Sequence, residues 1–266
     1  MGNLPLHKAR KRFGQHFLHD RNIITKLINA ISPKKDDFLL EIGPGQGALT
    51  FPLLQACQYL TAIELDRDLI PILQQKSSEF GELELINQDI LKFELETLKL
   101  HAPIRLVGNL PYNISTPLMF HLLKSVELIQ DMHFMVQKEV AQRIVANAGE
   151  PHYSRLSVMM QYFCQCQFLF GVAPGCFSPP PKVDSSIIRL VPHIQKDTEV
   201  NDFDLFSLIV KSAFNQRRKT IINSLKKVVD PSIISELGIN PKSRAENLFL
   251  QDYAAISQAQ SELKRA

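Results

Sequence analysis

Residues 38–47, FLLEIGPGQG, decide the fold of this chain. The first half, Phe38–Ile42, is a short apolar run typical of a buried strand, and residues 48–56 predict a helix. The glycine-rich turn between them lets the backbone come close to a ligand, and the following helix presents free N–H groups at its first turn. A strand, a glycine turn and a helix in this order predict the first unit of an open α/β sheet, with a ligand at the turn.

Acidic residues follow the next two predicted strands. Glu64 comes directly after the run Tyr59–Ile63, where a carboxylate is placed to accept both hydroxyls of a ribose. Asp89 comes after the run 83–87, where it can accept a hydrogen bond from an adenine amino group. These two acids therefore predict a ligand that carries adenosine.

The spacing of the glycines separates two kinds of adenosine ligand. Dinucleotide folds use G-x-G-x-x-G and place a pyrophosphate on the helix N-terminus. Residues 41–47 instead follow the pattern E-x-G-x-G-x-G, which is common in sites for S-adenosylmethionine, a ligand without phosphate. We expect S-adenosylmethionine here, and a nicotinamide-dependent oxidoreductase is the alternative from another class.

A second ligand is expected at residues 109–112, Asn-Leu-Pro-Tyr, which follow a predicted strand over 104–108. An exocyclic amine becomes a nucleophile only as its nitrogen turns tetrahedral, and acceptors for its two protons favour that change. The side-chain oxygen of Asn109 and the carbonyl of Leu110 are the natural pair of acceptors, and Pro111 can hold that carbonyl in place. The stretch therefore predicts methyl transfer to a flat heteroaromatic amine, with catalysis by orientation.

Two aromatic residues are candidates for stacking on the two faces of such a base. Tyr112 can stack on one face, worth roughly 1–3 kcal/mol. Phe177 begins the proline-rich loop 177–185, which we expect to project from the surface and to carry Phe177 to the other face. A base held on both faces must lie outside its stack, in a loop or flipped out of a helix.

The remaining chain divides into two regions by its patterns. Strands alternate with helices to about residue 172 and predict a parallel sheet, and the last two strands are expected as an antiparallel hairpin on one edge. From about residue 195 no strand pattern appears. The further strands are expected over 131–136, 168–172 and 187–191, and helices over 66–75, 138–146, 156–163, 203–229 and 247–263.

We therefore expect an α/β architecture with two domains. A Rossmann-like methyltransferase domain, preceded by a basic N-terminal segment, is predicted over 1–194. A small all-helical domain that contributes to RNA binding is predicted over 195–266.

Positive charge is concentrated in two clusters, although the net charge of the chain is only +3. One comprises Lys8 and Arg10–Arg12. The other extends from Lys211 to Lys227 without an acidic residue and contains Arg217, Arg218 and Lys219. A single cluster is usually a solvated face, but two clusters flanking a catalytic domain favour a polyanion partner.

Several classes of protein are disfavoured by composition. The sequence has no apolar run of about 18 residues that would predict a membrane span, and its basic start lacks the apolar core of a signal peptide. The four cysteines show no C-x-x-C spacing, so neither a zinc site nor a disulfide framework is expected. Reduced thiols fit the cytosol.

Taken together, these motifs resemble the ribosomal RNA adenine dimethyltransferases over nearly the whole chain. Residues 215–220, NQRRKT, and 244–248, RAENL, are similar to the small-subunit branch of this family. The other motifs that carry the resemblance are GQHFL at 14–18, EIGPGQG at 41–47, ELD at 64–66, NLPYN at 109–113 and FSPPPKVDS at 177–185.

The resemblance implies transfer of two methyl groups to N6 of each of two adjacent adenosines, in a hairpin loop near the 3′ end of small-subunit (16S) rRNA. It implies S-adenosyl-L-methionine as methyl donor, no metal and a pre-30S particle as partner. It also implies a role in small-subunit biogenesis, and that loss of the enzyme gives kasugamycin resistance in bacteria. A cytoplasmic monomer is expected. The donor site that the resemblance implies is made by His16, Leu18, Gly43, Glu64, Asp89 and Asn109.

Two alternatives stay open beside the oxidoreductase. The antibiotic-resistance branch, which acts on large-subunit rRNA, shares the donor site and the Asn-Leu-Pro-Tyr type of motif. The third reading is a binding module that holds RNA without chemistry.

Overall fold

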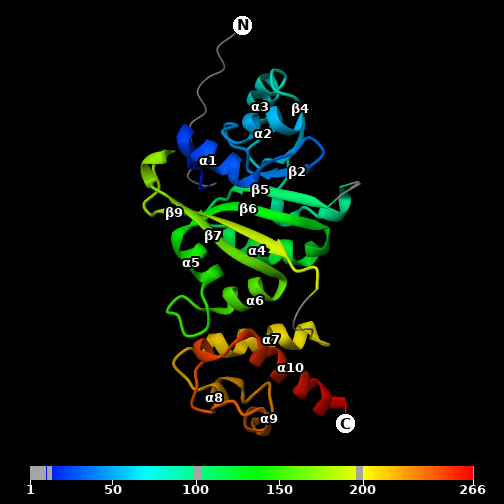
Figure 1. Ribbon diagram of the computed structural model, residues 1–266, viewed down its shortest axis with the longest axis vertical. Coiled ribbons are helices and arrows are strands. Elements are labelled where there is room, and N and C mark those ends of the chain that lie inside the picture. The colour runs from blue at the N-terminus through cyan, green and yellow to red at the C-terminus, as the bar shows by residue number, and fades with distance from the viewer. Residues whose placement is uncertain (1–9, 11–13, 99–102, 196–199, 266) are drawn as a thin grey trace. The chain divides into compact units, whose positions relative to one another are not determined.

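The computed structural model describes residues 10, 14–98, 103–195 and 200–265 (Figure 1). Contacts divide the chain into two compact units, one comprising residues 1–141 and 167–192 and the other comprising 142–166 and 193–266. These units differ from the predicted domains, 1–194 and 195–266, chiefly by the segment 142–166, whose contacts group it with the C-terminal helices.

The first unit is built on a seven-stranded sheet in the order β4-β3-β2-β5-β6-β9-β7. Strands β2 to β6 pair in parallel with their neighbours, whereas β9 runs antiparallel to β6. The expected parallel α/β sheet with its last two strands at one edge is confirmed. The strands are β2 (Phe38–Ile42), β3 (Tyr59–Ile63), β4 (Glu82–Ile86), β5 (Ile104–Asn109), β6 (Ile129–Gln137), β7 (Cys164–Val172) and β9 (Ser185–Pro192).

Helices and short turns lie before, between and after these strands. They are α1 (Arg21–Ile31), α2 (Thr50–Cys57), α3 (Ile70–Ser77), α4 (Ser115–Leu122) and α5 (Lys138–Val145), with short 3-10 turns η2 (Ile90–Lys92), η3 (Leu95–Thr97), η4 (Leu123–Leu128) and η5 (Pro174–Cys176). Asp20 caps α1 by accepting the Ile23 N–H at 2.9 Å. The helix predicted over 66–75 begins only at Ile70, because residues 66–69 form a turn closed by the Leu69 N–H on the Asp66 carbonyl at 3.0 Å.

The switch in strand order lies between β2 and β5, which pair side by side although β3 and β4 separate them in sequence. Gly108 makes their close approach possible at this point. A Cβ on Gly108 would lie 2.5 Å from the Ile42 carbonyl oxygen, so no larger residue fits without a shift of the backbone. In open α/β sheets ligands bind outside the carboxyl ends of the strands at such a switch, which places both predicted ligand turns at one edge.

The proline-rich loop does not carry Phe177 out to solvent. Phe177 and Ser178 form the short strand β8 (Phe177–Ser178), which pairs antiparallel with β1 (Phe17–Leu18). Successive side chains in a strand point to opposite faces. Ser178 is therefore exposed, whereas Phe177 is only 2% exposed and packs in the hydrophobic core with Leu18 and Ile187. The prediction that Phe177 projects is wrong for this reason.

The second unit is helical. Tyr162 of α6 lies 4.9 Å from Phe206 of α7, and Tyr153 lies 5.9 Å from Phe214, measured between ring centroids. These contacts explain why α6 groups with the C-terminal helices. The helices of the second unit are α6 (Arg155–Phe163), α7 (Phe203–Asn215), α8 (Ile221–Leu225), α9 (Pro231–Glu236), the 3-10 turn η6 (Ala245–Asn247) and α10 (Leu250–Arg265).

The prediction of one long helix over residues 203–229 is wrong in its second half. Helix α7 ends at Asn215, where Gln216 leaves helical geometry with φ −128° and ψ 54°. The basic residues 217–219 therefore lie in an exposed turn between α7 and α8 instead of on a helix face.

Within the described residues, no helix has both the length and the apolar character that a membrane crossing needs.

Candidate active site

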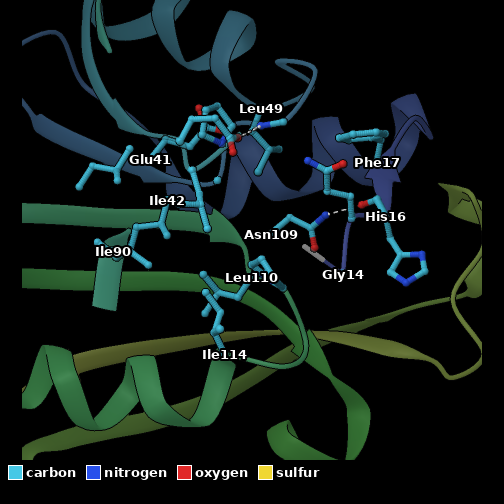
Figure 2. A pocket seen from close by; sticks show the side chains of 18 of the residues that line it. Gly14, His16, Phe17, Glu41, Ile42, Leu49, Ile90, Asn109, Leu110 and Ile114 are labelled. Carbon is cyan, nitrogen blue, oxygen red and sulfur yellow. Dashed lines mark hydrogen bonds between the residues drawn. The ribbon is translucent and has the colours of Figure 1, made fainter. Parts of the chain in front are cut away.

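A cleft opens at the carboxyl ends of β2, β3 and β5 and is also lined by the residues just after β4 (Figure 2). The described residues 14–18 complete its wall from the N-terminal side. Its empty volume is about 1110 Å³ when the part open to solvent is included. The predicted residues His16, Leu18, Gly43, Glu64, Asp89, Asn109, Leu110 and Tyr112 all line it.

Gly43 places the backbone of the glycine turn at the floor of the cleft. Its φ of +69° lies in the left-handed region that favours glycine, and its N–H donates to the Ile63 carbonyl at 2.9 Å. A Cβ at this position would lie 3.9 Å from the Asn109 carbonyl oxygen. The two predicted ligand turns therefore meet at Gly43.

The carboxylate of Glu64 is held by backbone donors on both oxygens. Oε2 accepts the Gly45 N–H at 3.1 Å, and Oε1 accepts the Asp66 N–H at 2.8 Å. Burial raises the pKa of Glu64, and the same two N–H groups act in the opposite direction. The side chain is thus fixed at the end of β3, with lone pairs left on both oxygens for a ligand.

Glu41 is a lining residue to which the sequence assigned no role. Its side chain is 2% exposed and accepts the Thr50 hydroxyl at 2.6 Å. Burial raises the pKa of Glu41 to about 8, so the carboxyl group is mainly protonated at neutral pH. The position of an acid two residues before the first glycine was the available signal, but sequence alone does not show that this acid is buried and neutral.

Asp89 begins the 3-10 turn η2 at the other end of the cleft. Its Oδ1 accepts the Leu91 N–H at 3.0 Å, so the residue has the capping role common for an aspartate at such a position. Asn87, just before it, donates from Nδ2 to the Glu64 carbonyl at 2.7 Å. This bond ties the turn that follows β4 to the one that follows β3.

Asn109 and Leu110 occupy the end of β5 (Figure 2). The Asn109 Nδ2 donates to the His16 carbonyl at 2.9 Å, which orients the side-chain oxygen as the free acceptor. The Leu110 N–H donates to the Met135 carbonyl at 3.0 Å and anchors the turn to β6. Both acceptors named from the sequence are therefore held by the sheet.

Tyr112 is fixed through its hydroxyl and its ring. The hydroxyl shares a hydrogen bond of 2.6 Å with the Ser185 hydroxyl, and burial raises the pKa of Tyr112, so the phenol stays protonated at neutral pH. The His16 ring stacks on Tyr112 with a centroid separation of 5.5 Å and an angle of 26°. His16 is itself held by a 2.8 Å hydrogen bond from Nδ1 to the Pro179 carbonyl.

Four predicted site residues are not among the described residues that line this cleft. Phe177 lies in the core, as described above. Arg217, Arg218 and Lys219 belong to the second unit and are exposed. Arg217 donates to the carbonyls of Pro151 at 3.3 Å and Tyr153 at 3.5 Å, so part of its hydrogen-bonding capacity has a structural use.

The first basic cluster also differs from its prediction where it is described. Arg10 pairs with Asp66 at 2.9 Å and with Asp68 instead of offering a free charge. Its other members, Lys8, Lys11 and Arg12, lie outside the described residues.

The described residues contain no group of three or more histidine, cysteine or acidic side chains that could hold a metal ion. The described cysteines, Cys57, Cys164, Cys166 and Cys176, form no disulfide bond with one another.

The geometry agrees with what this chain is similar to. The model of the family described as ribosomal RNA adenine dimethylase matches residues 6–261. A ribosomal RNA small subunit methyltransferase A of Coxiella burnetii is 50% identical, with 97% of this chain and 98% of that protein covered. One of Marinobacter nauticus is 49% identical, with 97% and 93% covered.

Solved structures show the same fold. A dimethyladenosine transferase from Plasmodium falciparum superposes with a TM-score of 0.76 at 28% identity, over 91% of this chain and 96% of that one. The 23S rRNA methyltransferase ErmE superposes with a TM-score of 0.72 at 25% identity, over 92% and 99%. The predicted Rossmann-like methyltransferase fold is thereby confirmed.

Proposed function

Because the chain belongs to the ribosomal RNA adenine dimethylase family, we propose that it dimethylates N6 of two adjacent adenosines of small-subunit rRNA with S-adenosyl-L-methionine as donor. The target is a hairpin loop near the 3′ end of 16S rRNA. The observation that carries this proposal is a single cleft in which the two acids predicted for an adenosine ligand, Glu64 and Asp89, meet the Asn109–Tyr112 turn.

The lining of the cleft fits the donor. Two carboxyl residues, Glu64 and Asp89, lie in the lining beside the protonated Glu41, and no lysine or arginine occurs among the described lining residues. Such a wall suits a cationic ligand without phosphate better than a dinucleotide with its pyrophosphate. Glu64 would accept the ribose hydroxyls and Asp89 the adenine amino group, with Gly43, His16 and Leu18 forming the remaining wall.

The donor supplies an electrophilic methyl carbon on a sulfonium sulfur. The protein's own residues prepare the amine that attacks it. Oδ1 of Asn109 and the carbonyl of Leu110 would accept the two N6 protons, which favours the tetrahedral nitrogen, and the rigid end of β5 aligns it. The proton is lost easily once the nitrogen carries positive charge, so no general base is needed.

Stacking holds the target base. Tyr112 offers one face, with its ring plane set by Ser185 and His16. Phe177 could supply the second face only after β8 separates from β1, because its ring now packs in the core. We therefore propose Phe177 as a base contact of the RNA-bound state alone.

The exposed turn 217–219 is the proposed RNA contact of the second unit. Three consecutive basic residues on a turn can follow a phosphate backbone, and such contacts make binding fall with salt. The proposed partner is small-subunit rRNA within a pre-30S particle, which this protein would meet in the cytoplasm as a monomer.

Mass spectrometry of rRNA after reaction with donor and separated ribosomal subunits tests the proposal. We expect dimethyladenosine at two adjacent positions of small-subunit RNA. Methylation confined to large-subunit RNA would instead establish the antibiotic-resistance type of activity. Calorimetric binding of NAD without binding of S-adenosylhomocysteine would establish the oxidoreductase.

The variant Asn109→Ala separates catalysis from RNA binding. It removes one acceptor of the amine protons without changing the basic turn, so RNA affinity should stay close to that of the wild type while most methyl transfer is lost. Unchanged turnover would remove Asn109 from the catalytic residues. RNA affinity with no methyl transfer by the wild type would leave only a binding module.

A further inference from the structure

Three residues form a hydrogen-bonded group beside the donor cleft, which we call the Asp66 lock: Arg10, Gln15 and Asp66. The Arg10 guanidinium donates from Nη1 to Asp66 Oδ1 at 2.9 Å, and Gln15 donates from Nε2 to Asp66 Oδ2 at 3.0 Å. The Arg10 backbone N–H in turn donates to Gln15 Oε1 at 2.7 Å. The Asp66 side chain is fully buried, and that of Arg10 is 32% exposed.

The lock attaches the N-terminal side of the cleft to the residue proposed to hold the ribose. The Asp66 N–H donates to Glu64 Oε1 at 2.8 Å, so one residue contacts both Glu64 and the N-terminal segment. The described residues of that segment, Arg10 and 14–18, are more than 45 residues away in sequence. The lock is therefore a tertiary connection between two walls of the cleft.

The segment 14–18 contacts the other walls as well. The Phe17 ring covers Gly45, where a Cβ would lie 3.1 Å from it. The His16 carbonyl accepts the Asn109 Nδ2, and its ring stacks on Tyr112. A segment that touches the glycine turn and the catalytic turn sets the shape of the cleft only if it is itself held in place. Of these contacts only the lock includes an ion pair, and the carboxylate of that pair is buried.

We propose that Arg10 and Asp66 are positioning residues for the methyl donor. They hold segment 14–18 against the cleft, so that the wall made by His16 and Leu18 is formed before the donor binds and donor affinity is raised by preorganisation. The inference rests on the proposed function, since it names the donor as S-adenosyl-L-methionine. It also gives Arg10 a role other than contact with RNA phosphates, because two carboxylates already neutralise its charge.

Asp66 has a second, local use that a test must separate from this role. Its Oδ1 accepts the Asp68 N–H at 3.3 Å and its carbonyl accepts the Leu69 N–H at 3.0 Å, so it also shapes the turn before α3. A change at Asp66 alone could act through that turn. Arg10→Gln keeps the turn and the backbone bond to Gln15 and removes the charged contacts of Arg10 with Asp66 and Asp68, so a control at Asp68 is needed to isolate the lock.

Isothermal titration with S-adenosylhomocysteine tests the proposal on the full chain. We expect Arg10→Gln and Asp66→Asn each to weaken binding roughly tenfold, about 1.4 kcal/mol. The double variant should be little weaker than either single variant, because both changes break the same ion pair. Asp68→Asn is the matched control: its side chain is 45% exposed, and an exposed pair with Arg10 contributes little.

Steady-state kinetics supply the readout that a merely structural role would not move. In Arg10→Gln the KM for the donor should rise roughly tenfold, with kcat at saturating donor and the KM for RNA both within about twofold of the wild type. A rise in the KM for RNA with unchanged donor affinity would overturn the proposal and make Arg10 a phosphate contact. Donor affinity within twofold of the wild type in both single variants would also overturn it. If the wild type itself fails to bind S-adenosylhomocysteine, the proposed function fails, which is a distinct result.

Discussion

The carboxylate of Glu64 offers the sharpest single test of the donor site. Glu64→Gln keeps the size and shape of the side chain but removes its charge and one acceptor oxygen. In the structure both oxygens already accept backbone N–H groups, from Gly45 at 3.1 Å and Asp66 at 2.8 Å. The amide NH₂ of glutamine must therefore face one of these two donors, and that hydrogen bond is lost.

The magnitude follows from the bonds that the variant cannot make. A hydrogen bond to a charged group contributes about 1.5–3 kcal/mol, and the ribose hydroxyls would lose one such acceptor. A loss of about 2–3 kcal/mol corresponds to roughly 30- to 150-fold weaker binding. Folding stability should fall by less than ligand binding, because a neutral amide avoids the desolvation that raises the pKa of the buried Glu64 carboxylate, and this offsets part of the lost backbone hydrogen bond.

Titration calorimetry with S-adenosylhomocysteine measures the loss, and urea unfolding checks stability. Glu84→Gln is the matched control, because the Glu84 carboxylate also accepts two hydrogen bonds, from the hydroxyls of Tyr59 and Thr61, but lies outside the cleft. The control should bind the ligand as the wild type does. Binding by Glu64→Gln within threefold of the wild type would refute the assignment of Glu64 to the ribose.

Three further changes test the buried charges and the basic turn. Burial lowers the pKa of His133 to about 4, against about 6.5 in the unfolded chain. The unfolded state therefore binds the proton more readily, and the free energy of unfolding should fall by up to about 3 kcal/mol as the pH drops from 6.5 toward 4. Urea titrations should not find this pH dependence in His133→Asn. Arg105→Met removes the ion pairs of Arg105 with Asp37 and with the buried Asp131 at 2.9 Å, and leaves Asp131 only the longer contact with Arg189 at 3.8 Å. The free energy of unfolding in urea should fall by about 3–5 kcal/mol, and a fall below 1 kcal/mol would contradict this. Replacing Arg218 and Lys219 by alanine should flatten the dependence of RNA affinity on salt by about two units of log–log slope, whereas an unchanged slope would make the turn an ordinary solvated surface.

Much of the sheet and the donor half of the cleft could be predicted from the sequence. The strands β2 and β3 have the predicted bounds, because a short apolar run between a turn and a glycine motif is a local signal. The place of Glu64 and Asp89 at the cleft followed from their position after strands, since the ends of parallel strands meet at one edge. The Asn109–Tyr112 turn lies at this edge for the same reason, and its catalytic role stays a prediction.

Signals that depend on partners far along the chain were missed. The side on which Phe177 packs depends on β1, about 160 residues earlier, and that pairing turns the ring into the core. The ion-pair partners of Arg10, Asp66 and Asp68, lie more than 50 residues after it. The sequence therefore showed Arg10 only as a member of a basic cluster, whereas in the structure its charge is paired beside the donor cleft. Helical periodicity likewise continued through Gln216, although the backbone breaks there.

By itself the sequence determined the order of strands and helices, the glycine turn and the acids that face it, because these follow from local periodicity and from the residues that a turn requires. Only the tertiary structure decided which charges are neutralised, which carboxyl group is buried and protonated, and which aromatic ring covers Tyr112. Burial and ion pairing join residues from distant segments, and no spacing within one segment encodes them.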